Sequence, residues 1–325
     1  MIYVVKTEAT EKYINMPIMI AEEIGEDISY EIPESGKIWH YYFLDRDSSI
    51  KPNRDVAYKW DNKIFQYEQF KDSMRIPDYD VYENSIRLVS DFSKLKRKYG
   101  KFMITLEHGF YGMEYLYCDD DITPKHVFQK YGYNKKLRVS KFIKDADSVS
   151  LHLIVANHDE FYISPITKQN IKETTLYRGG SYPYMSRDKF IEYCSIINNA
   201  LVDDGYFGLS HIDFLVTDEV YFGEINPRIA GSTPYMCYSL EQEYGINLPY
   251  LEYHAVQNRS LPSINTKRKC NIVWDFEIKE GMRPNDLWIS HKDIRNAFNT
   301  SGRYHIPFGE KYVRLKLRND KGTDI

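Results

Sequence analysis

Hydrophobic residues recur at two different spacings along the chain, so both helices and strands are predicted. Apolar residues that alternate or cluster over about four to eight positions are typical of strands, whereas apolar residues three or four apart indicate helices. In the first half, strands are predicted over 2–5, 101–107, 113–118 and 137–143, and helices over 10–24, 62–74, 88–99 and 124–131. The polar stretch 45–55 contains Pro52 and is expected to form a loop.

The second half continues this mixture. Strands are predicted over 148–156, 160–166, 209–216, 220–226 and 270–278, and helices over 186–205, 233–256 and 291–298. The clearest helix is 186–205, which Ser186 can cap and Gly205 ends. Its apolar face consists of Phe190, Cys194, Ile197 and Leu201. In the first half, the first 60 residues are expected to form a small α/β cap, and the alternating helices and strands that end at 143 fit a compact α+β subdomain.

Composition and charge narrow the possible functions. The 325 residues include 43 Lys and Arg against 47 Asp and Glu, a net charge of −4, which lacks the cationic excess of a general nucleic-acid binder. Aromatic residues make up 15% of the chain, which argues against a disordered protein. No apolar run reaches the roughly 20 residues of a membrane span, and the N-terminus lacks a signal-peptide pattern. We therefore expect a cytoplasmic protein that binds neither nucleic acid nor membrane.

The spacing of cysteines and histidines indicates neither a disulfide framework nor a zinc site. The four cysteines lie far apart, without a CxxC pair, and the nine histidines form no HExxH motif. The cysteines are therefore expected to be scattered reduced thiols. The cysteines are Cys118, Cys194, Cys237 and Cys270.

The segment 211–234, HIDFLVTDEVYFGEINPRIAGSTP, carries the most informative group of polar residues. It predicts a β-hairpin. With Asp218 and Glu219 as the turn, Asp213 on the first strand pairs with Glu224 on the second. Residues two apart share a face of a strand, so Asn226 is expected beside Glu224. The pairing would place two carboxylates opposite each other with a carboxamide next to them.

Directly opposed carboxylates destabilise a sheet unless a cation offsets them. A hard divalent cation such as Mg²⁺ takes oxygen ligands and suits this set. Arg228, two residues beyond Asn226, has a planar fork suited to phosphoryl or carboxylate oxygens. The alternative from spacing alone is an exposed hairpin whose carboxylates face water.

The run D-x(10)-E-I-N-P-R, after a long amphipathic helix, resembles the metal-binding end of the ATP-grasp superfamily. The resemblance implies an ATP-grasp fold, in which two α+β subdomains grip a nucleotide. It implies that Asp213, Glu224 and Asn226 hold the magnesium of MgATP and that Arg228 contacts the reacting phosphate. The following IAGSTP is similar to a loop that shapes the acceptor pocket in carboxylate–amine ligases of this group. Mn²⁺ is an alternative cation.

Earlier segments are similar to nucleotide-binding parts of the same superfamily. Lys63 resembles a nucleotide-side lysine, HGFYGMEY a glycine loop over the triphosphate, 137–143 a hinge whose backbone meets adenine, and 167–183 a loop facing the active site. On residue type alone, a surface lysine, a plain turn and a buried strand are the alternatives for the first three. The nucleotide-binding candidates are Lys63, Gly109, Gly112, Lys141, Phe142, Ile143, Lys168 and Arg178, with Gln169 as a further candidate.

Two residues depart from the resemblance. Thr105 stands where a lysine for the α and β phosphates is usual, and Ser140 stands where the hinge often carries an acidic residue. Lys168, Arg178 and Arg228 are candidates to compensate for the missing charge at Thr105. The expected organisation is an N-terminal cap over 1–60, a lid subdomain with its entry helix over 61–140, a catalytic core over 141–262 and a C-terminal extension over 263–325.

The resemblance implies an ATP-dependent carboxylate–amine ligase. A carboxylate, from an amino acid or peptide, would be phosphorylated by MgATP and then attacked by an amine, releasing ADP and phosphate. The alternatives are an ATP-grasp enzyme with another acceptor, of kinase or carboxylase type, and a non-catalytic nucleotide-binding relative. A homodimer is a further expectation from the resemblance.

Overall fold

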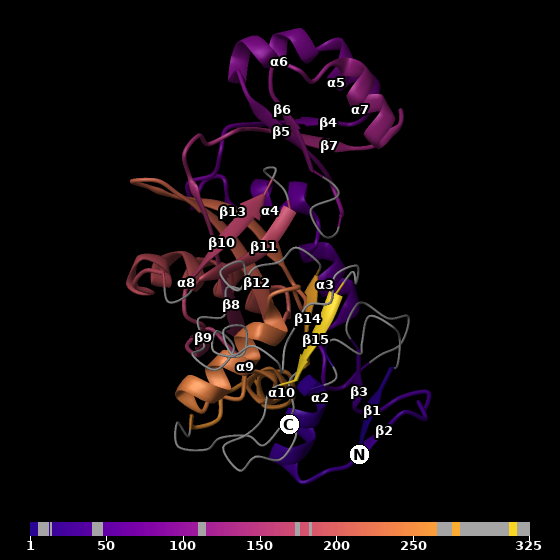
Figure 1. Ribbon diagram of the computed structural model, residues 1–325, viewed down its shortest axis with the longest axis vertical. Coiled ribbons are helices and arrows are strands. Elements are labelled where there is room, and N and C mark those ends of the chain that lie inside the picture. Colours follow the sequence, from indigo (N-terminus) through magenta and orange to yellow (C-terminus); the bar gives the residue numbers. More distant parts are fainter. Residues whose placement is uncertain are drawn as a thin grey trace.

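Four β-sheets and the helices packed on them make up the described part of the computed structural model (Figure 1). The structure describes residues 1–5, 13, 15–40, 48–109, 115–172, 176–181, 184–264, 275–279 and 312–316. In Figure 1 a four-stranded sheet lies at the top, a six-stranded sheet in the middle and a three-stranded N-terminal sheet at the bottom. The fourth sheet pairs β14 (Asp275–Lys279) with β15 (Tyr312–Lys316).

The N-terminal sheet is parallel and small. Its strands, in spatial order, are β2 (Ile28–Ser29), β1 (Ile2–Val4) and β3 (Ile38–Trp39). Helix α2 (Asn15–Ile24) buries Met16, Met19 and Ile20 in a core shared with β1 and two later helices, α9 (Thr233–Tyr244) and α10 (Leu248–Asn258). The N-terminal segment is thereby fixed against the second half of the chain.

The four-stranded sheet is antiparallel, in the order β4-β7-β5-β6. Its strands are β4 (Tyr79–Tyr82), β5 (Phe102–Leu106), β6 (Tyr115–Cys118) and β7 (Leu137–Lys141). Three helices cover one face: α5 (Ser85–Ser90), α6 (Phe92–Tyr99) and α7 (Pro124–Tyr131). Phe102, Ile104 and Val139 point into this helix-covered core. Because strand side chains alternate, the residues between them face away from the helices.

The six-stranded sheet is also antiparallel. The path β11-β10-β8-β12-β13 carries β9 as an additional partner of β8. The strands are β8 (Asp147–Val155), β9 (Phe161–Ile163), β10 (Thr167–Lys172), β11 (Leu176–Ser181), β12 (Gly208–Val216) and β13 (Val220–Asn226). One face packs on α3 (Arg54–Trp60), α4 (Lys63–Phe70) and α8 (Asp188–Asp203).

The other face of the six-stranded sheet divides into an apolar and a polar end. Leu209 and Ile154 pack in the core with α9 (Thr233–Tyr244) and α10 (Leu248–Asn258). Two and four residues after Leu209 on β12, His211 and Asp213 occupy the same face. The hydrophobic contact with α10 therefore fixes the start of β12, and polar side chains follow further along the same face of this strand.

Several predicted elements differ from those observed. The helix predicted over 88–99 is split into α5 and α6 at Asp91, and the helix predicted over 233–256 is split into α9 and α10 after Gly245, which has a left-handed backbone. The prediction of a loop over 45–55 was wrong at its end, because Asn53 caps α3, which begins at Arg54. The expected loop 167–183 contains the paired strands β10 and β11.

At the start of α8 the predicted cap is only partly right. Arg187 occupies the capping position, while the Ser186 hydroxyl accepts a hydrogen bond from the backbone N–H of Asp188. Gly205 follows the helix with a φ of +79°, as expected of a helix-ending glycine. The helix predicted over 291–298 lies outside the described residues.

Candidate active site

The β12–β13 hairpin pairs Asp213 with Glu224, which confirms the predicted pairing. The predicted turn is wrong, however. Val216 pairs with Val220, so residues 217–219 form a three-residue turn, and Gly223 is an extra residue that restores the register. A Cβ atom at Gly223 would lie 2.7 Å from the backbone oxygen of Asp213. The carboxylates can face each other because the bulged position is a glycine.

The outer edge of β13 is held by the side-chain amide of Gln66 on α4. Gln66 Nε2 donates to the backbone oxygen of Ile225 at 2.7 Å, and Gln66 Oε1 accepts from the backbone N–H of Ile225 at 2.8 Å. Gln66 thus takes the place of a neighbouring strand between Glu224 and Asn226. It fixes the backbone that carries both side chains.

Asp213, Glu224 and Asn226 form one cluster. Asn226 Nδ2 donates to Asp213 Oδ2 at 3.1 Å and to Glu224 Oε1 at 2.9 Å. Gln169 on β10 donates from Nε2 to Asp213 Oδ1 at 2.8 Å. The three residues predicted as metal ligands are therefore joined by hydrogen bonds, and Gln169 extends the cluster.

Electrostatics distinguish the two carboxyl groups. Burial and the neighbouring charge of Glu224 raise the pKa of Asp213 well above its usual range. Burial also acts to raise the pKa of Glu224, but the Lys63 ammonium and the hydrogen bonds from Tyr115 and Asn226 hold it at about 2. Glu224 is therefore ionised at neutral pH, whereas the charged form of Asp213 is disfavoured unless a cation offsets it.

Lys63 and Tyr115 approach Glu224 from two other elements. Lys63 is the first residue of α4 and is fully buried, with Nζ 3.1 Å from Glu224 Oε2. Tyr115 is the first residue of β6, and its hydroxyl donates to the same oxygen. Lys63 was predicted to lie on the nucleotide side, and the structure brings it to the carboxylates. Sequence analysis missed Tyr115, since only the spatial contact between the two sheets reveals it.

Arg228 lies beside the cluster and close to a second buried carboxylate. Its terminal nitrogen donates to Asn226 Oδ1 at 3.0 Å, and its Nε lies 3.5 Å from Asp61 Oδ1. Asp61 is fully buried, and within the described part of the chain neither of its carboxylate oxygens has a hydrogen-bond partner. His108 Nδ1 lies 3.9 Å from Asp61 Oδ2. Sequence analysis did not identify Asp61 or His108.

Two histidines line the sheet next to the carboxylates. His211 pairs across the strands with His152 and Asn226, and its Nδ1 lies 3.6 Å from Asp213 Oδ2. Burial lowers the pKa of His211 to about 4 and that of His152 well below its usual range. His152 Nε2 lies 3.0 Å from the hydroxyl of Thr233, at the start of α9. Both imidazoles are therefore neutral at pH 7.

The remaining predicted nucleotide-binding residues are distributed over three places. Lys168 points to the opposite face of β10 from Gln169, and its Nζ lies 2.5 Å from Asp147 Oδ1, so the structure does not bring it to the carboxylates. Arg178 lies on β11, but its side chain is outside the described part. Gly109 is buried at the start of the glycine loop, and Gly112 lies outside the described residues.

The predicted hinge residues lie at the end of β7. The backbone N–H of Lys141 donates to Asp78, and that of Phe142 donates to Lys101. These two N–H groups are therefore engaged within the protein, and an adenine would have to meet other backbone groups of the stretch. The Phe142 ring contacts Tyr117, with ring centroids 4.8 Å apart, and Ile143 is half-buried.

The donor chemistry of the cluster fits a magnesium ion. Within the described residues no three His, Cys, Asp or Glu side chains are grouped to hold a metal by themselves. Mg²⁺ is usually held by one or two carboxylates, with water and phosphate oxygens completing its coordination. Asp213 and Glu224 supply two opposed carboxylates, and the raised pKa of Asp213 reflects the cost of a second buried negative charge, which a cation would offset.

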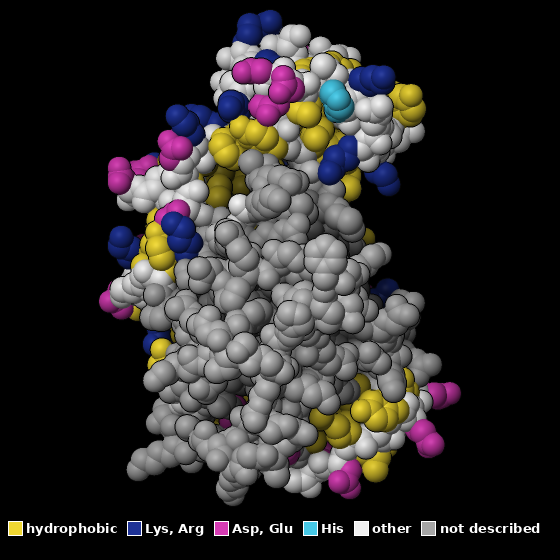
Figure 2. All heavy atoms as spheres, in the orientation of Figure 1, with side chains coloured by type: hydrophobic (Ala, Val, Ile, Leu, Met, Phe, Trp, Pro, Cys, Tyr) yellow, Lys and Arg dark blue, Asp and Glu magenta, His cyan; other side chains and the backbone are white. Residues whose placement is uncertain are grey.

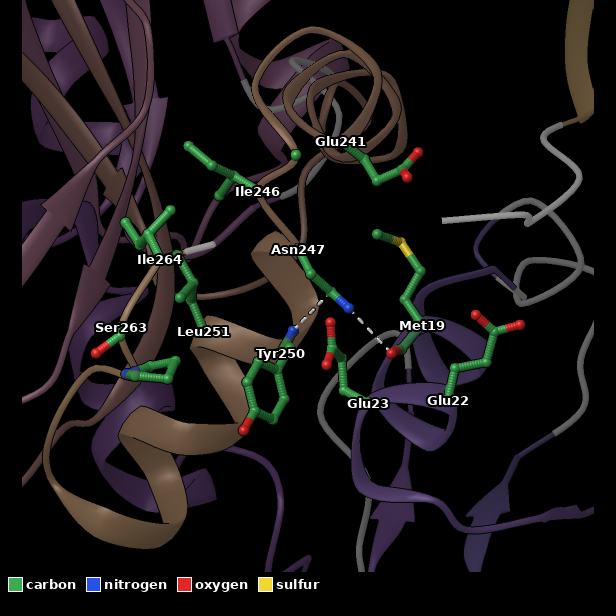
Figure 3. A pocket seen from close by; sticks show the side chains of 12 residues that line it. Met19, Glu22, Glu23, Glu241, Ile246, Asn247, Tyr250, Leu251, Ser263 and Ile264 are labelled. Carbon is green, nitrogen blue, oxygen red and sulfur yellow. Dashed lines mark hydrogen bonds between the residues drawn. The ribbon is translucent and has the colours of Figure 1, made fainter. Parts of the chain in front are cut away.

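A cleft elsewhere in the molecule is lined by α2, α9, α10 and the segment after α10 (Figure 3). Figure 3 shows Glu23 on α2 close to Asn247, whose amide donates to the backbone oxygen of Met19 at 3.0 Å. None of the candidate site residues lines this cleft. It is therefore separate from the chemistry described above.

Comparison with known proteins connects these residues to a family. The model of an ATP-grasp domain matches residues 60–232, more than half of the chain. This chain belongs to the ATP-grasp family. The match includes Lys63, the four-stranded sheet, both carboxylates and Arg228, so the site lies within the ATP-grasp domain. The family assignment and the α+β fold expected from sequence are confirmed.

Solved structures show the same fold at low sequence identity. N5-carboxyaminoimidazole synthetase from Staphylococcus aureus, complexed with ADP, has a TM-score of 0.62 and 14% identity over 80% of this chain and 78% of that chain. N5-carboxyaminoimidazole ribonucleotide synthetase from Thermus thermophilus has a TM-score of 0.63 and 12% identity over 98% and 94%. The search of curated proteins found no match.

A biotin carboxylase domain is also similar to this ATP-grasp chain. That of Hydrogenobacter thermophilus 2-oxoglutarate carboxylase, a dimer in complex with MgADP, ADP and bicarbonate, has a TM-score of 0.56 and 15% identity over 82% of this chain and 62% of that chain.

Among the described residues, no helix is long and apolar enough to cross a membrane. Figure 2 shows acidic and basic side chains interspersed over the four-stranded subdomain on the face in view.

Proposed function

We propose that this ATP-grasp enzyme is a carboxylate–amine ligase that forms an amide bond through an acyl phosphate. The observation that carries the proposal is the cluster of Asp213, Glu224 and Asn226, joined to Arg228 and faced by the four-stranded sheet. It combines an oxygen-donor cation site with a guanidinium suited to a phosphoryl group.

The proposed reaction has two steps. An oxygen of the substrate carboxylate attacks the γ-phosphorus of ATP, and ADP leaves. An amine then attacks the carbonyl carbon of the acyl phosphate, phosphate leaves and the amine proton is released. A bound Mg²⁺ would supply charge neutralisation at the phosphate oxygens. Asp213 and Glu224 would hold the ion, and Arg228, which lies beside Asn226, would stabilise the charge that develops on the transferred phosphoryl group.

The carboxylate is an amino acid or small peptide in this proposal, and bicarbonate is the second candidate. The structural neighbours favour the second candidate, since their names describe carboxylation and one of them was solved with bicarbonate. Both candidates follow the same chemistry, because bicarbonate, like a carboxylate, has an anionic oxygen that ATP can phosphorylate. The two candidates therefore differ only in the molecule that ATP phosphorylates, which is an amino acid or peptide in one case and bicarbonate in the other.

The test measures ADP and free phosphate released from MgATP with pooled amino acids and, separately, with bicarbonate and pooled amines. Glu224→Gln serves as the blank, and Glu219→Gln, at the exposed tip of the same hairpin, is the matched control. We expect equal release of ADP and phosphate that depends on the amino-acid pool. Glu224→Gln should reduce it at least about 100-fold, since changing even a neighbour of a metal ligand costs about 10- to 100-fold.

Each other outcome assigns a different activity. Turnover that needs bicarbonate and an amine supports the carboxylase-type reaction. ADP without matching free phosphate indicates a kinase, because the product then keeps the phosphoryl group. Unchanged turnover in Glu224→Gln would refute the metal assignment.

A further inference from the structure

Three residues form a row across the four-stranded sheet, on the face that its helices leave uncovered. Thr105 on β5 pairs with Tyr115 on β6 and with Arg138 on β7. Their neighbours Ile104 and Val139 point to the helix-covered core. Since side chains alternate along a strand, Tyr115, Thr105 and Arg138 share the opposite face.

This row faces the candidate carboxylates. The Tyr115 hydroxyl donates to Glu224 Oε2. At the other end of the row, Arg138 Nη1 donates to the backbone oxygen of Lys63 at 2.8 Å, and the ammonium of the same lysine is 3.1 Å from Glu224 Oε2. A phosphate group bound to a cation on Glu224 would therefore lie close to the row.

Two polar atoms in the row are buried without a hydrogen-bond partner in the described part of the chain. They are Arg138 Nε and Thr105 Oγ1, and the two side chains are 3% and 0% exposed. The Arg138 guanidinium lies 3.6 Å from the centre of the Tyr67 ring, which fixes its plane. A buried donor without a partner is costly, and a buried cation needs an anion nearby. Both atoms lie on adjacent strands, so one anionic group can satisfy both.

We propose that Arg138 and Thr105 bind a phosphate group of the nucleotide, with Arg138 as the cation that the four-stranded sheet contributes to the site. The proposal rests on the proposed function, since it assumes a nucleotide between the two sheets. A guanidinium matches phosphate oxygens with several N–H donors in one plane, and the Thr105 hydroxyl adds a further donor. The positive charge that a lysine would carry at position 105 is supplied instead by Arg138, the residue paired with Thr105 on the neighbouring strand.

A purely structural role for Arg138 makes a different prediction. In that role the guanidinium only packs on Tyr67 and holds the backbone of Lys63, so a cation placed on another strand could not replace it. In the proposed role a positive charge is needed near the phosphate, whichever strand carries it. A lysine at position 105, directly across from Arg138, would place an ammonium in the space that the guanidinium occupies.

The experiment measures dissociation constants of MgADP and adenosine by calorimetry for the full chain and four variants. The first is Arg138→Met, which keeps the length of the side chain without its charge. The second combines Arg138→Met with Thr105→Lys. The third is Arg138→Lys, and the fourth is Arg87→Met, which removes an exposed arginine from α5 as a matched control.

We expect Arg138→Met to weaken MgADP binding about 10- to 100-fold, the range for hydrogen bonds to charged groups. Adenosine binding should change less than about twofold, because adenosine lacks phosphate. Adding Thr105→Lys should recover at least about tenfold of the loss. Arg87→Met should leave both constants unchanged. Melting curves establish that each variant is folded.

Several results would overturn the proposal. They are unchanged MgADP binding in Arg138→Met, equal losses for MgADP and adenosine, and no recovery with Thr105→Lys in a folded double variant. If Arg138→Met does not fold, Arg138→Lys decides: selective loss of MgADP affinity supports the proposal, and unchanged affinity overturns it. A wild-type chain that binds MgADP but shows no ligase turnover refutes the proposed function and leaves this assignment intact.

Discussion

Gly223 is the residue on which the geometry of the two carboxylates most directly depends, and Gly223→Ala tests it. The bulge places its Cα against the backbone of the opposite strand. An added Cβ would lie 2.7 Å from the backbone oxygen and 3.2 Å from the backbone carbon of Asp213. Both contacts involve backbone atoms, so no side-chain rotation can relieve them.

The size of the effect follows from these contacts. A carbon and an oxygen that are not bonded lie about 3.2 Å or more apart, so the strands must separate by roughly half an ångström. Overpacking of this kind costs about 1–3 kcal/mol of stability. Functional groups need to be held within about 0.5 Å of their productive positions, so the pairing of Asp213 with Glu224 should be lost as a cation site.

The assay compares Gly223→Ala with Gly231→Ala in thermal unfolding and in Mg²⁺-dependent ADP binding. Gly231 is a matched control, since an added Cβ there meets nothing within 4 Å. We expect Gly223→Ala to lower the unfolding free energy by about 1–3 kcal/mol and to remove most of the Mg²⁺ dependence of binding. Wild-type behaviour in both measurements would refute the argument that the bulge sets the site.

Three further predictions concern buried charged and polar groups. Lys63→Met should cost about 3–5 kcal/mol in urea unfolding, because it leaves a buried carboxylate unpaired, whereas Lys59→Met, at an exposed ion pair, should cost less than about 1 kcal/mol. Asp61→Asn should lower kcat about 10- to 100-fold with ADP affinity unchanged, since it removes the charge beside Arg228; equal effects on both would contradict this. The pKa of His152 is lowered in the folded chain, so this imidazole stays neutral when the pH falls below about 6.5, whereas in the unfolded chain it takes up a proton. The free energy of unfolding should therefore decrease below that pH by up to about 1.4 kcal/mol per pH unit. In urea titrations, His152→Gln should reduce that slope, and an unchanged slope would contradict the assignment.

The parts of the site that could be predicted from sequence lie close together in the chain. Asp213, Glu224 and Asn226 are separated by one hairpin, and strand alternation alone places them on one face. Even here the correct pairing came from a turn that was wrong by one residue, and the extra residue at Gly223 compensates. The period of two in a strand predicts faces well, and the number of residues in a turn less well.

The residues that sequence analysis missed come from distant parts of the chain. Tyr115 reaches Glu224 across 109 residues, and Gln66 reaches the backbone beside it across 159 residues. Asp61 has no motif of its own, and only its complete burial next to Arg228 marks it as unusual. Contacts of this kind depend on how one sheet packs on another, which neither local periodicity nor residue type encodes.

The orientation of one amide adds a chemical constraint that residue types alone do not contain. Asn226 directs Nδ2 to both carboxylates and Oδ1 to Arg228. A cation held by the carboxylates repels an N–H group and attracts the amide oxygen, so it favours rotation of the amide. Rotation would move Oδ1 away from Arg228 and free that guanidinium for a phosphoryl oxygen. Under the proposed function, binding of the cation and availability of Arg228 would therefore be linked through a single side chain, because Oδ1 cannot point in both directions at once.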